Sequence, residues 1–283
     1  MSMAREGAGW PERAFVFLAP VISLALILNF SPPVPSSEMT DQELASYYCP
    51  VLMFSPDERL RPMDALEYME NCSLWNMRTG VPTLVEENIT FDGLVNSTSY
   101  SYLDCKAGGL DDNGIIDSYA WNGSMPLSYV AITHSGTGTI IQYWFFYAFN
   151  YGQMNRHEGD WEMYQVMLDK YQVPQWAMVS QHHSGQKAMW SSLEKVDGSV
   201  TVHVELGSHA MFFTARAENE QACVFKMVDF DHTVLTYEGR WGEWAGNLGD
   251  LLGRRGPPGP MFREDGAMWQ GFGWGLSLPQ TEG

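Results

Sequence analysis

β-Branched and aromatic residues concentrate in six segments of the second half of the chain. These segments span residues 129–134, 139–149, 161–168, 177–182, 200–206 and 224–230. Turn residues such as Ser135-Gly136 and Asp197-Gly198 separate them, and no long stretch after the N-terminal region repeats its apolar residues with helical spacing. The pattern predicts a mainly β fold, an antiparallel β-sandwich with long loops and few short helices.

The first half of the chain is more polar. Asp64 precedes an apolar-rich stretch and predicts the N-cap of a short helix over residues 64–71. Residues 73–128 are rich in turn-forming residues. Within them Asp111, Asn113 and Asp117 resemble half of a calcium loop, although the closing bidentate glutamate is absent. The same residues also fit a metal-free Asp/Asn/Gly turn.

The N-terminal region carries an apolar run without charges, residues 14–30, after Arg5 and Arg13. Its length lies between that of a membrane-spanning helix and that of a signal-peptide core. Residues 1–30 are therefore predicted to be a signal-anchor or a cleaved signal peptide, with a buried core helix as the alternative. A Pro/Ser-rich linker, residues 31–40, leads into a single domain, residues 41–283. This organisation predicts a protein attached to the membrane by its N-terminal segment with an extracellular domain, or a secreted one.

Cysteines and glycosylation sequons agree with export. The four cysteines, an even number, allow three disulfide pairings, of which chain order suggests Cys49–Cys72 and Cys105–Cys223 as the simplest. Asn-x-Ser/Thr sequons predict glycosylation at Asn71, Asn88, Asn96 and Asn122.

The charge balance narrows the range of partners. Acidic residues outnumber basic ones, 34 to 16, which gives a formal net charge of −18. Because nucleic-acid affinity requires clustered Lys and Arg, we expect the chain not to bind nucleic acid. Broad docking on anionic lipid is disfavoured for the same reason. An acidic surface suits cation binding or simple solubility.

The segment around residue 160 carries the densest chemistry. If residues 160–168 form a strand, Asp160 and Glu162 project from the same face, and two adjacent carboxylates repel each other unless a cation or proton lies between them. His157 lies three residues upstream, across Gly159. The three side chains predict a site for one divalent cation, Ca²⁺ or Mg²⁺ first and Mn²⁺ or Zn²⁺ as further candidates. The alternative is a solvated acidic strand edge.

Four sequence blocks resemble the vacuolar protein sorting 62 family: QYWFF to HEGDWE (142–162), SQHHSG (180–185), VELGSHA (204–210) and the tail GRWG to GPPGP (239–260). The resemblance covers roughly residues 47–275. More distantly, His157, Asp160 and Glu162 resemble the H-x-H-D-W-E core of the necrosis-inducing cytolysins, secreted β-sandwich toxins. That resemblance implies that these three residues hold a divalent cation used in binding membrane glycolipid. For the cytolysins' further acidic ligand, Asn150 is the nearest polar residue.

Other polar residues are candidates for supporting roles at the same site. Strand ends at one rim of a sandwich gather binding loops, which places His182, His183, Ser208 and His209 near the predicted cation. Glu158 lies in the sequence between the predicted ligands His157 and Asp160, and its role would discriminate between two functions. The first is a non-catalytic recognition module for glycan, lipid headgroup or protein at a cell surface. The second is a metal-dependent hydrolase with Glu158 or His209 as general base. A self-associating structural or filament subunit is a third hypothesis.

Overall fold

The structure, a computed structural model, describes residues 39–108, 113–153, 156–244 and 255–281. The predicted N-terminal segment, residues 1–30, most of the linker and Asp111 of the predicted calcium loop lie outside the described residues. Within the described part of the chain, no helix is both long enough and apolar enough to cross a membrane.

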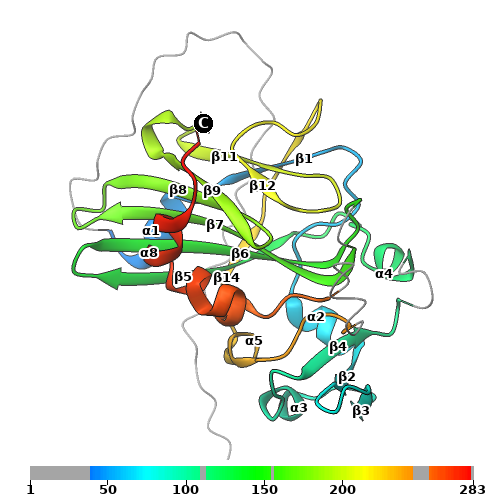
Figure 1. The fold of residues 1–283 in the computed structure, drawn as a ribbon. Coiled ribbons are helices and arrows are strands. Elements are labelled where there is room, and N and C mark those ends of the chain that lie inside the picture. Colours follow the sequence, from blue (N-terminus) through cyan, green and yellow to red (C-terminus); the bar gives the residue numbers. More distant parts are fainter. Residues whose placement is uncertain (1–38, 109–112, 154–155, 245–254, 282–283) are drawn as a thin grey trace, which may run out of the picture.

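The elements are predominantly strands joined by loops (Figure 1). The strands are β1 (Val51–Phe54), β2 (Cys72–Asn76), β3 (Thr83–Glu86), β4 (Ser101–Cys105), β5 (Leu127–Ser135), β6 (Gly138–Asn150), β7 (His157–Asp169), β8 (Pro174–Gln181), β9 (Ser184–Met189), β10 (Lys195–Val196), β11 (Ser199–Val204), β12 (Met211–Phe212), β13 (Gln221–Cys223) and β14 (Lys226–Asp229). The helices are α1 (Asp41–Tyr47), α2 (Ala65–Glu70), α3 (Phe91–Val95), α4 (Asn113–Ser118), α5 (His232–Thr236), α7 (Ala267–Gln270) and α8 (Phe272–Ser277), with 3₁₀ turns η1 (Trp190–Ser192) and η2 (Pro260–Gly266).

The strands form three sheets. The largest has six strands in the order β14-β5-β6-β7-β8-β9. A second joins β10, β11, β1 and β13, with β12 paired to β11, and a third joins β3, β2 and β4. A mainly β fold with few short helices is confirmed. Most pairings are antiparallel, but β1 pairs with β11 and β14 pairs with β5 in parallel. Each of these two pairs joins distant parts of the chain, so no hairpin turn forces an antiparallel arrangement.

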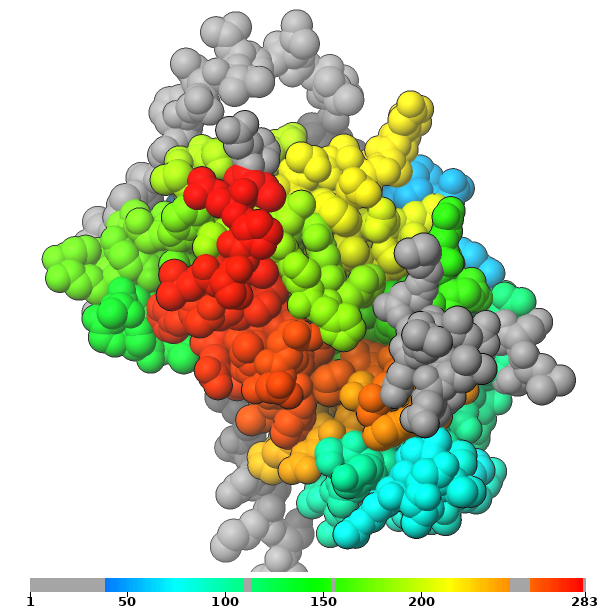
Figure 2. All heavy atoms as spheres, in the orientation of Figure 1, coloured from blue at the N-terminus to red at the C-terminus, as the bar shows by residue number. Residues whose placement is uncertain are grey.

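The centre of the large sheet is buried on both faces. Every residue of β6 is buried, as are the first ten of β7. Helices α7 and α8 cover one face (Figure 1), and the C-terminal segment that carries them lies across that face in the space-filling view (Figure 2). There the Gln142 and Gln165 side chains donate to the carbonyls of Met268 (2.8 Å) and Gly271 (3.3 Å). The opposite face carries Tyr147, whose ring stacks on His209 in the loop between β11 and β12, and β12 packs against β7 and β8.

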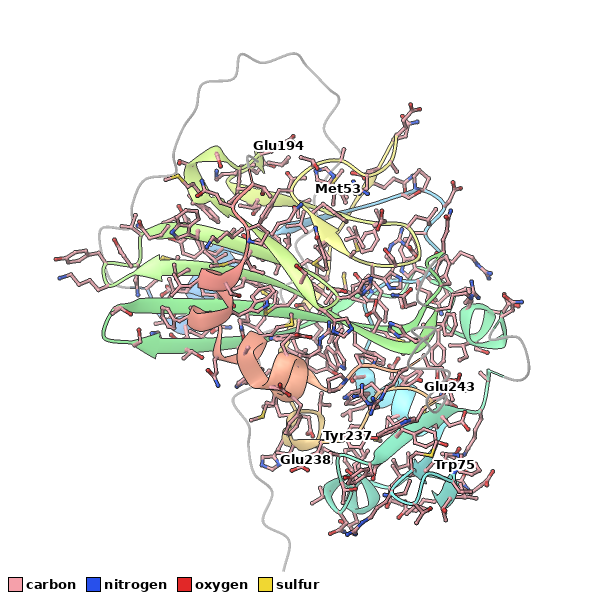
Figure 3. The ribbon with its side chains drawn as sticks, in the orientation of Figure 1. Met53, Trp75, Glu194, Tyr237, Glu238 and Glu243 are labelled. Atoms are coloured by element: carbon pink, nitrogen blue, oxygen red, sulfur yellow. The ribbon has the colours of Figure 1, made fainter. Side chains whose placement is uncertain are left out.

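The first half of the chain contains more regular structure than its polar composition indicates. The predicted helix is confirmed as α2, with the Asp64 side chain accepting from the Leu66 amide at its N-terminus. Residues 73–128, expected to be turn-rich, also contain β2, β3, β4, α3 and α4. β2, β3 and β4 form a small sheet at one side of the molecule, where Trp75 is labelled in Figure 3.

Candidate metal centre

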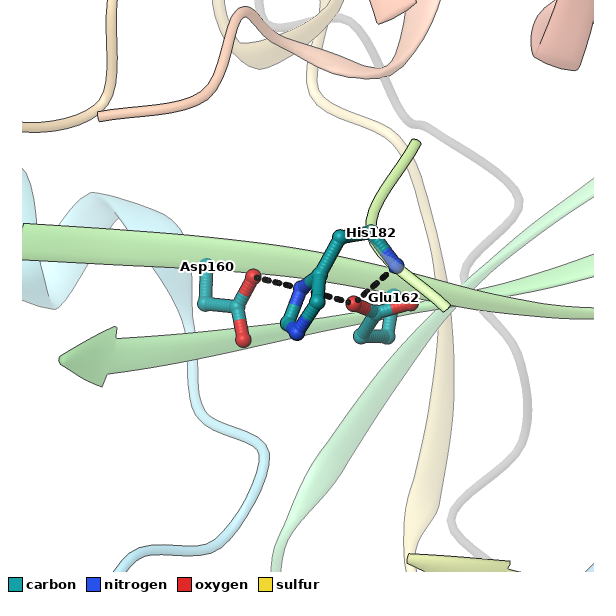
Figure 4. A group of neighbouring side chains, drawn as sticks. All are labelled: Asp160, Glu162 and His182. Carbon is teal, nitrogen blue, oxygen red and sulfur yellow. Dashed lines mark hydrogen bonds and ion pairs between the residues drawn. The ribbon is translucent and has the colours of Figure 1, made fainter. Parts of the chain in front are cut away.

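Strand β7 places two carboxylates on one face at one end of the large sheet. Asp160 pairs in register with Tyr147 and Glu162 with Phe145, whereas Trp161 between them points to the opposite face. His182 follows directly after β8 in a left-handed backbone conformation, with φ of 59°. Figure 4 shows its imidazole between the two carboxyl groups. One ligand atom from each of Asp160, Glu162 and His182 lies within 4.8 Å of the others.

Glu162 is held by several hydrogen bonds. Its Oε1 atom accepts from the amide of His182 at 3.0 Å and lies 2.9 Å from that residue's Nδ1. Its Oε2 accepts from the hydroxyl of Ser180. Because these partners are fixed by β8 and its end, the carboxylate has a defined direction toward the cluster.

Asp160 has one paired oxygen and one unpaired oxygen. Oδ2 lies 3.1 Å from Nδ1 of His209, which is fully buried and stacks on the Tyr147 ring with centroids 3.9 Å apart. Oδ1 is buried and accepts no hydrogen bond within the described residues, and the Nδ1 atom of His182 is 3.9 Å away. A buried carboxylate oxygen without a hydrogen bond raises the free energy of the folded state, and a bound cation would remove this cost.

Glu58 completes the polar cluster from the opposite side of His209. Its Oε1 is 3.7 Å from Nε2 of His209 and accepts from the hydroxyl of Tyr151 at 2.5 Å. Its Oε2 accepts from the amide of Gly207 at 2.7 Å. His209 thus lies between two buried carboxylates.

These contacts determine the charges of the site. Burial disfavours ionisation of Asp160, but the His209 hydrogen bond and nearby histidine charges lower its pKa to about 2. Burial also opposes protonation of His182, but the charge and hydrogen bond of Glu162 and the charge of Asp160 raise its pKa to about 9. The pKa of His209 likewise rises to about 9, against its burial, through Asp160 and Glu58. Ionised carboxylates and protonated imidazoles therefore neutralise one another in this structure.

His157 lies beside the cluster without being one of its three members. Its Nδ1 is 2.7 Å from the carbonyl of Gly159, and its ring centroid is 6.5 Å from that of His182. Because a carbonyl only accepts, Nδ1 carries the proton and Nε2 keeps its lone pair. Burial lowers the pKa of His157, which favours the neutral ring. An Nδ1–H donated to a carbonyl is typical of metal-binding histidines.

The other candidates at this rim occupy different surroundings. The Asn150 side chain donates to the Ser208 carbonyl (3.2 Å) and accepts from the Gly152 amide (3.0 Å), which joins the two loops. The Ser208 hydroxyl donates to Glu205 at 3.0 Å. His183 is exposed and lies 2.8 Å from Glu264.

Glu158 points away from the three-residue cluster. Its Oε2 accepts from the Cys105 amide at 3.1 Å and from the Tyr68 hydroxyl at 3.4 Å. Burial raises the pKa of this carboxyl well above its ordinary value. Glu158 thus connects β7 to the small sheet.

The remaining predicted sites lie elsewhere. Asn113 and Asp117 belong to helix α4, and Asp117 forms an ion pair with Arg59 at 2.8 Å. All four cysteines are free thiols here, and Cys72 lies opposite Cys105 rather than near Cys49, unlike the pairing that chain order suggests. All four sequon asparagines are exposed: Asn71, Asn88, Asn96 and Asn122.

A buried arginine supports His182 from the C-terminal segment. Arg263 donates to the Trp161 carbonyl at 2.6 Å and to the carbonyl of His182. It thereby ties η2 to β7 and to the turn that carries the imidazole. Arg263, Glu58 and Ser180 were not singled out by sequence reasoning. Ser180 belongs to the SQHHSG block, which was the only available signal for these residues.

Comparison with known proteins gives one curated relative. No known family profile matches the chain. The chain is 25% identical over 205 residues to a protein of Saccharomyces cerevisiae named "Putative vacuolar protein sorting-associated protein TDA6". The match covers 58% of this chain and 43% of the yeast protein, so the chain spans less than half the length of that relative. The similarity to a vacuolar protein sorting protein expected from the sequence blocks is confirmed.

Among solved structures, the neighbours are necrosis-inducing cytolysins at low similarity. One, described as a toxin fold for microbial attack and plant defense, has a TM-score of 0.45 and 14% identity, covering 74% of this chain and 87% of its own. Another is Necrosis and Ethylene inducing Protein 2 from the agent of cocoa's Witches Broom disease. It has a TM-score of 0.42 and 12% identity, with 78% and 95% covered.

Proposed function

We propose that this protein is a cation-dependent recognition module that acts at a cell surface. The observation that carries the proposal is the buried Asp160 Oδ1 atom, which has no hydrogen-bond partner within the described residues and faces Glu162 and His182. A divalent cation bound by these three residues would satisfy that oxygen. The cation would also take over from the protonated His182 the neutralisation of the two carboxylates, because a histidine binds a metal only in its neutral form.

The donor set defines which ions fit. Two carboxylates suit Ca²⁺, Mg²⁺ and Mn²⁺, and an imidazole extends the range to Zn²⁺. His157, with its Nδ1 proton held by the Gly159 carbonyl, is the nearest candidate for a fourth ligand. The hydrogen bonds of Ser180 to Glu162 and of His209 to Asp160 would orient the two carboxylates, as outer partners do at protein metal sites.

Oxygen-rich ligands at a surface are the proposed partners of this module. A cation at the rim of a β-fold attracts hydroxyl and phosphate oxygens, which glycans and lipid headgroups supply. Location outside the cytoplasm is supported by the apolar run of residues 14–30 and by the exposure of the four sequon asparagines.

The position of Glu158 favours a binder over a hydrolase. A general base must reach the proton that it removes, at about 2.6–3.2 Å or through one water. The Glu158 carboxyl instead bonds Cys105 and Tyr68, away from the cluster. These hydrogen bonds hold the Glu158 carboxyl between β7 and the small sheet.

Two measurements test the proposal. Elemental mass spectrometry of the purified full chain, dialysed without chelator, should find about one divalent cation per chain. Glycan arrays and liposomes of defined headgroup should then bind the chain with cation present and lose it when chelator is added. A metal-free protein whose melting temperature does not respond to Ca²⁺, Mg²⁺, Mn²⁺ or Zn²⁺ would refute the cation site. Metal-dependent turnover of phosphoester, glycoside or peptide substrates would favour the hydrolase instead.

A further inference from the structure

Two cysteines face each other inside the small three-stranded sheet. Strands β2 and β4 are antiparallel, and their register pairs Cys72 directly with Cys105. Both side chains are buried, and the Cys72 thiol donates to the Tyr68 carbonyl at 3.2 Å. Neither residue belongs to the candidate metal centre.

The hydrogen-bond pattern of the ladder identifies the kind of pair. The Lys106 amide donates to the Asn71 carbonyl at 3.0 Å, so residues 71 and 106 form a hydrogen-bonded pair. Hydrogen-bonded and non-hydrogen-bonded pairs alternate along an antiparallel ladder, and Cys72 and Cys105 therefore form a non-hydrogen-bonded pair. In agreement, the Cys105 amide donates outside the ladder, to Glu158 at 3.1 Å.

This geometry fits a disulfide. The Cα atoms of a non-hydrogen-bonded pair lie about 4.5 Å apart, with the side chains close together. Disulfides join Cα atoms that are about 4.4–6.8 Å apart. The backbone of β2 and β4 would therefore accept the bond without moving.

The other two cysteines do not meet this requirement. Cys223 lies opposite Leu52 in the β1–β13 pairing. Cys49 is three residues before Leu52, which corresponds to about 10 Å of extended chain. Since disulfides do not form when the Cα atoms are more than about 7 Å apart, Cys49 and Cys223 are not a pair in this fold.

We propose that Cys72 and Cys105 form a disulfide in the mature protein, while Cys49 and Cys223 remain thiols. The oxidant is a disulfide of the secretory pathway, either an oxidised dithiol oxidoreductase or glutathione disulfide. One cysteine thiolate attacks the oxidant to form a mixed disulfide, and the second cysteine thiolate then displaces the reduced thiol of the oxidant. Two thiol protons leave the protein, and the oxidant gains two electrons and two protons. Because both sulfurs are buried in the folded chain, the bond forms while this sheet assembles.

The bond would close the segment that carries β3, α3 and the sequons at Asn88 and Asn96. It would also fix the amide of Cys105, which holds Glu158 only two residues from Asp160. The disulfide thus fastens the small sheet to the strand that supplies the candidate metal ligands.

Peptide mapping of the wild-type full chain tests this proposal without any variant. Protein made through a eukaryotic secretory pathway is unfolded with an alkylating reagent and no reductant, deglycosylated and digested with trypsin. Arg78 lies between the two cysteines, so trypsin separates their peptides unless a disulfide joins them. We expect a linked pair of peptides with Cys72 and Cys105, lighter by two hydrogens than the separate thiol peptides, and alkyl groups on Cys49 and Cys223.

Single substitutions provide the matched control. Cys72→Ser should leave Cys105 alkylated, whereas Cys49→Ser should keep the linked peptides. Alkylation of all four cysteines in the unreduced wild-type chain would overturn the proposal. A link from Cys72 to Cys49 or to Cys223 would overturn it equally. Metal content measured on the same preparation separates this result from the proposed cation site.

Discussion

At the scale of single residues, the site consists of carboxylates whose charges depend on imidazoles. Asp160 and Glu162 share His182, and Asp160 and Glu58 share His209. A buried ion pair contributes little net stability, but removal of one partner leaves an uncompensated charge. Substitutions at this site therefore test both the cation and the internal pairs.

Substitution of Asp160 by Asn should abolish cation-dependent stabilisation. At ~100 times its dissociation constant, a cation that binds only the folded chain adds about 2.7 kcal/mol to the free energy of unfolding. We expect thermal unfolding of the wild type, but not of Asp160→Asn, to respond to the cation. Asp57→Asn makes the same chemical change at an exposed position and should keep the full response. An unchanged response in Asp160→Asn would place the cation elsewhere.

Substitution of His209 by Ala should destabilise the fold without any cation. It removes the stacked ring, leaves Glu58 buried without its ion-pair partner and takes from Asp160 the closer of its two. Loss of one partner from a buried pair costs about 3–5 kcal/mol, which urea unfolding at neutral pH would measure. His183→Ala, at a histidine whose side chain is 79% exposed, should change the free energy of unfolding by less than about 0.5 kcal/mol. Equal effects of the two substitutions would contradict the arrangement.

Sequence reasoning identified the carboxylates but missed Glu58. Asp160 and Glu162 alternate along a strand-forming segment, so their shared face was predictable. Glu58 stands between Asp57 and Arg59 and has the appearance of a solvated charge. It is buried because Tyr151 and Gly207 bond its two oxygens, and both lie far away in the chain. The turn after β8 directs the His182 side chain toward Asp160 and Glu162, and no local sequence pattern specifies the conformation of that turn.

At the scale of elements, strand β7 depends on one glycine. Gly159 has φ of 60°, and a Cβ atom there would collide with the Trp241 carbonyl. The segment around Trp241 therefore lies directly on β7, beside the candidate metal ligands. Because Gly159 has no side chain, the Trp241 segment can pack against the start of β7 and bury it.

Gly159→Ala should be strongly destabilising, and two other glycines separate its causes. Gly123 has φ of 91° with nothing within 4 Å of a Cβ atom, so Gly123→Ala tests the backbone conformation alone, at about 1–2 kcal/mol. Gly136→Ala has neither problem and should be nearly neutral. Gly159→Ala adds steric overlap, worth roughly 1–3 kcal/mol more. Urea midpoints should follow the order Gly136, Gly123, Gly159, from least to most affected.

The η2 segment should influence cation affinity through Arg263. Arg263→Gln loses the bonds to the carbonyls of Trp161 and His182 and so loosens the imidazole. Loss of outer partners at metal sites typically weakens affinity by about 10–100-fold. Titration with the cation identified by elemental analysis measures this change. Arg216→Gln, at an arginine paired with Glu205, should keep the wild-type affinity, and a loss of equal size there would indicate a general charge effect instead.

Six strands were predictable because long runs of β-branched and aromatic residues identify them. β5, β6, β7, β8, β11 and β14 each overlap a predicted segment. β1 to β4 were missed because no comparable run of β-branched and aromatic residues marks them, and each has only four or five residues. Strands this short are specified by their neighbours rather than by their own pattern. The parallel pairings of β1 with β11 and of β14 with β5 were also unpredictable, because no local pattern specifies which distant strands pair.

At the scale of the whole molecule, the net charge of −18 complicates any test with salts. Every divalent salt screens repulsion among acidic side chains, whether or not a site exists. A specific site should saturate at about one cation per chain, whereas screening continues to increase with ionic strength. We therefore expect the melting temperature to reach a plateau with the bound cation and to show no plateau at the same concentrations with NaCl matched for ionic strength. A gradual rise of equal size with both salts would indicate screening alone.

The parallel pairing of β1 with β11 also has a consequence for the order of folding. β1 pairs with β11 and β13, near residues 201 and 222. During synthesis its four residues must wait until most of the chain has been made, because contacts distant in sequence close late. The hairpins β5–β6–β7–β8 can pair as soon as each strand is made. The loop that carries His209 comes between β11 and β12, so the contact of His209 with Asp160 in the candidate metal centre forms only with this sheet. A nascent chain that stops before β11 therefore presents Asp160 and Glu162 without His209.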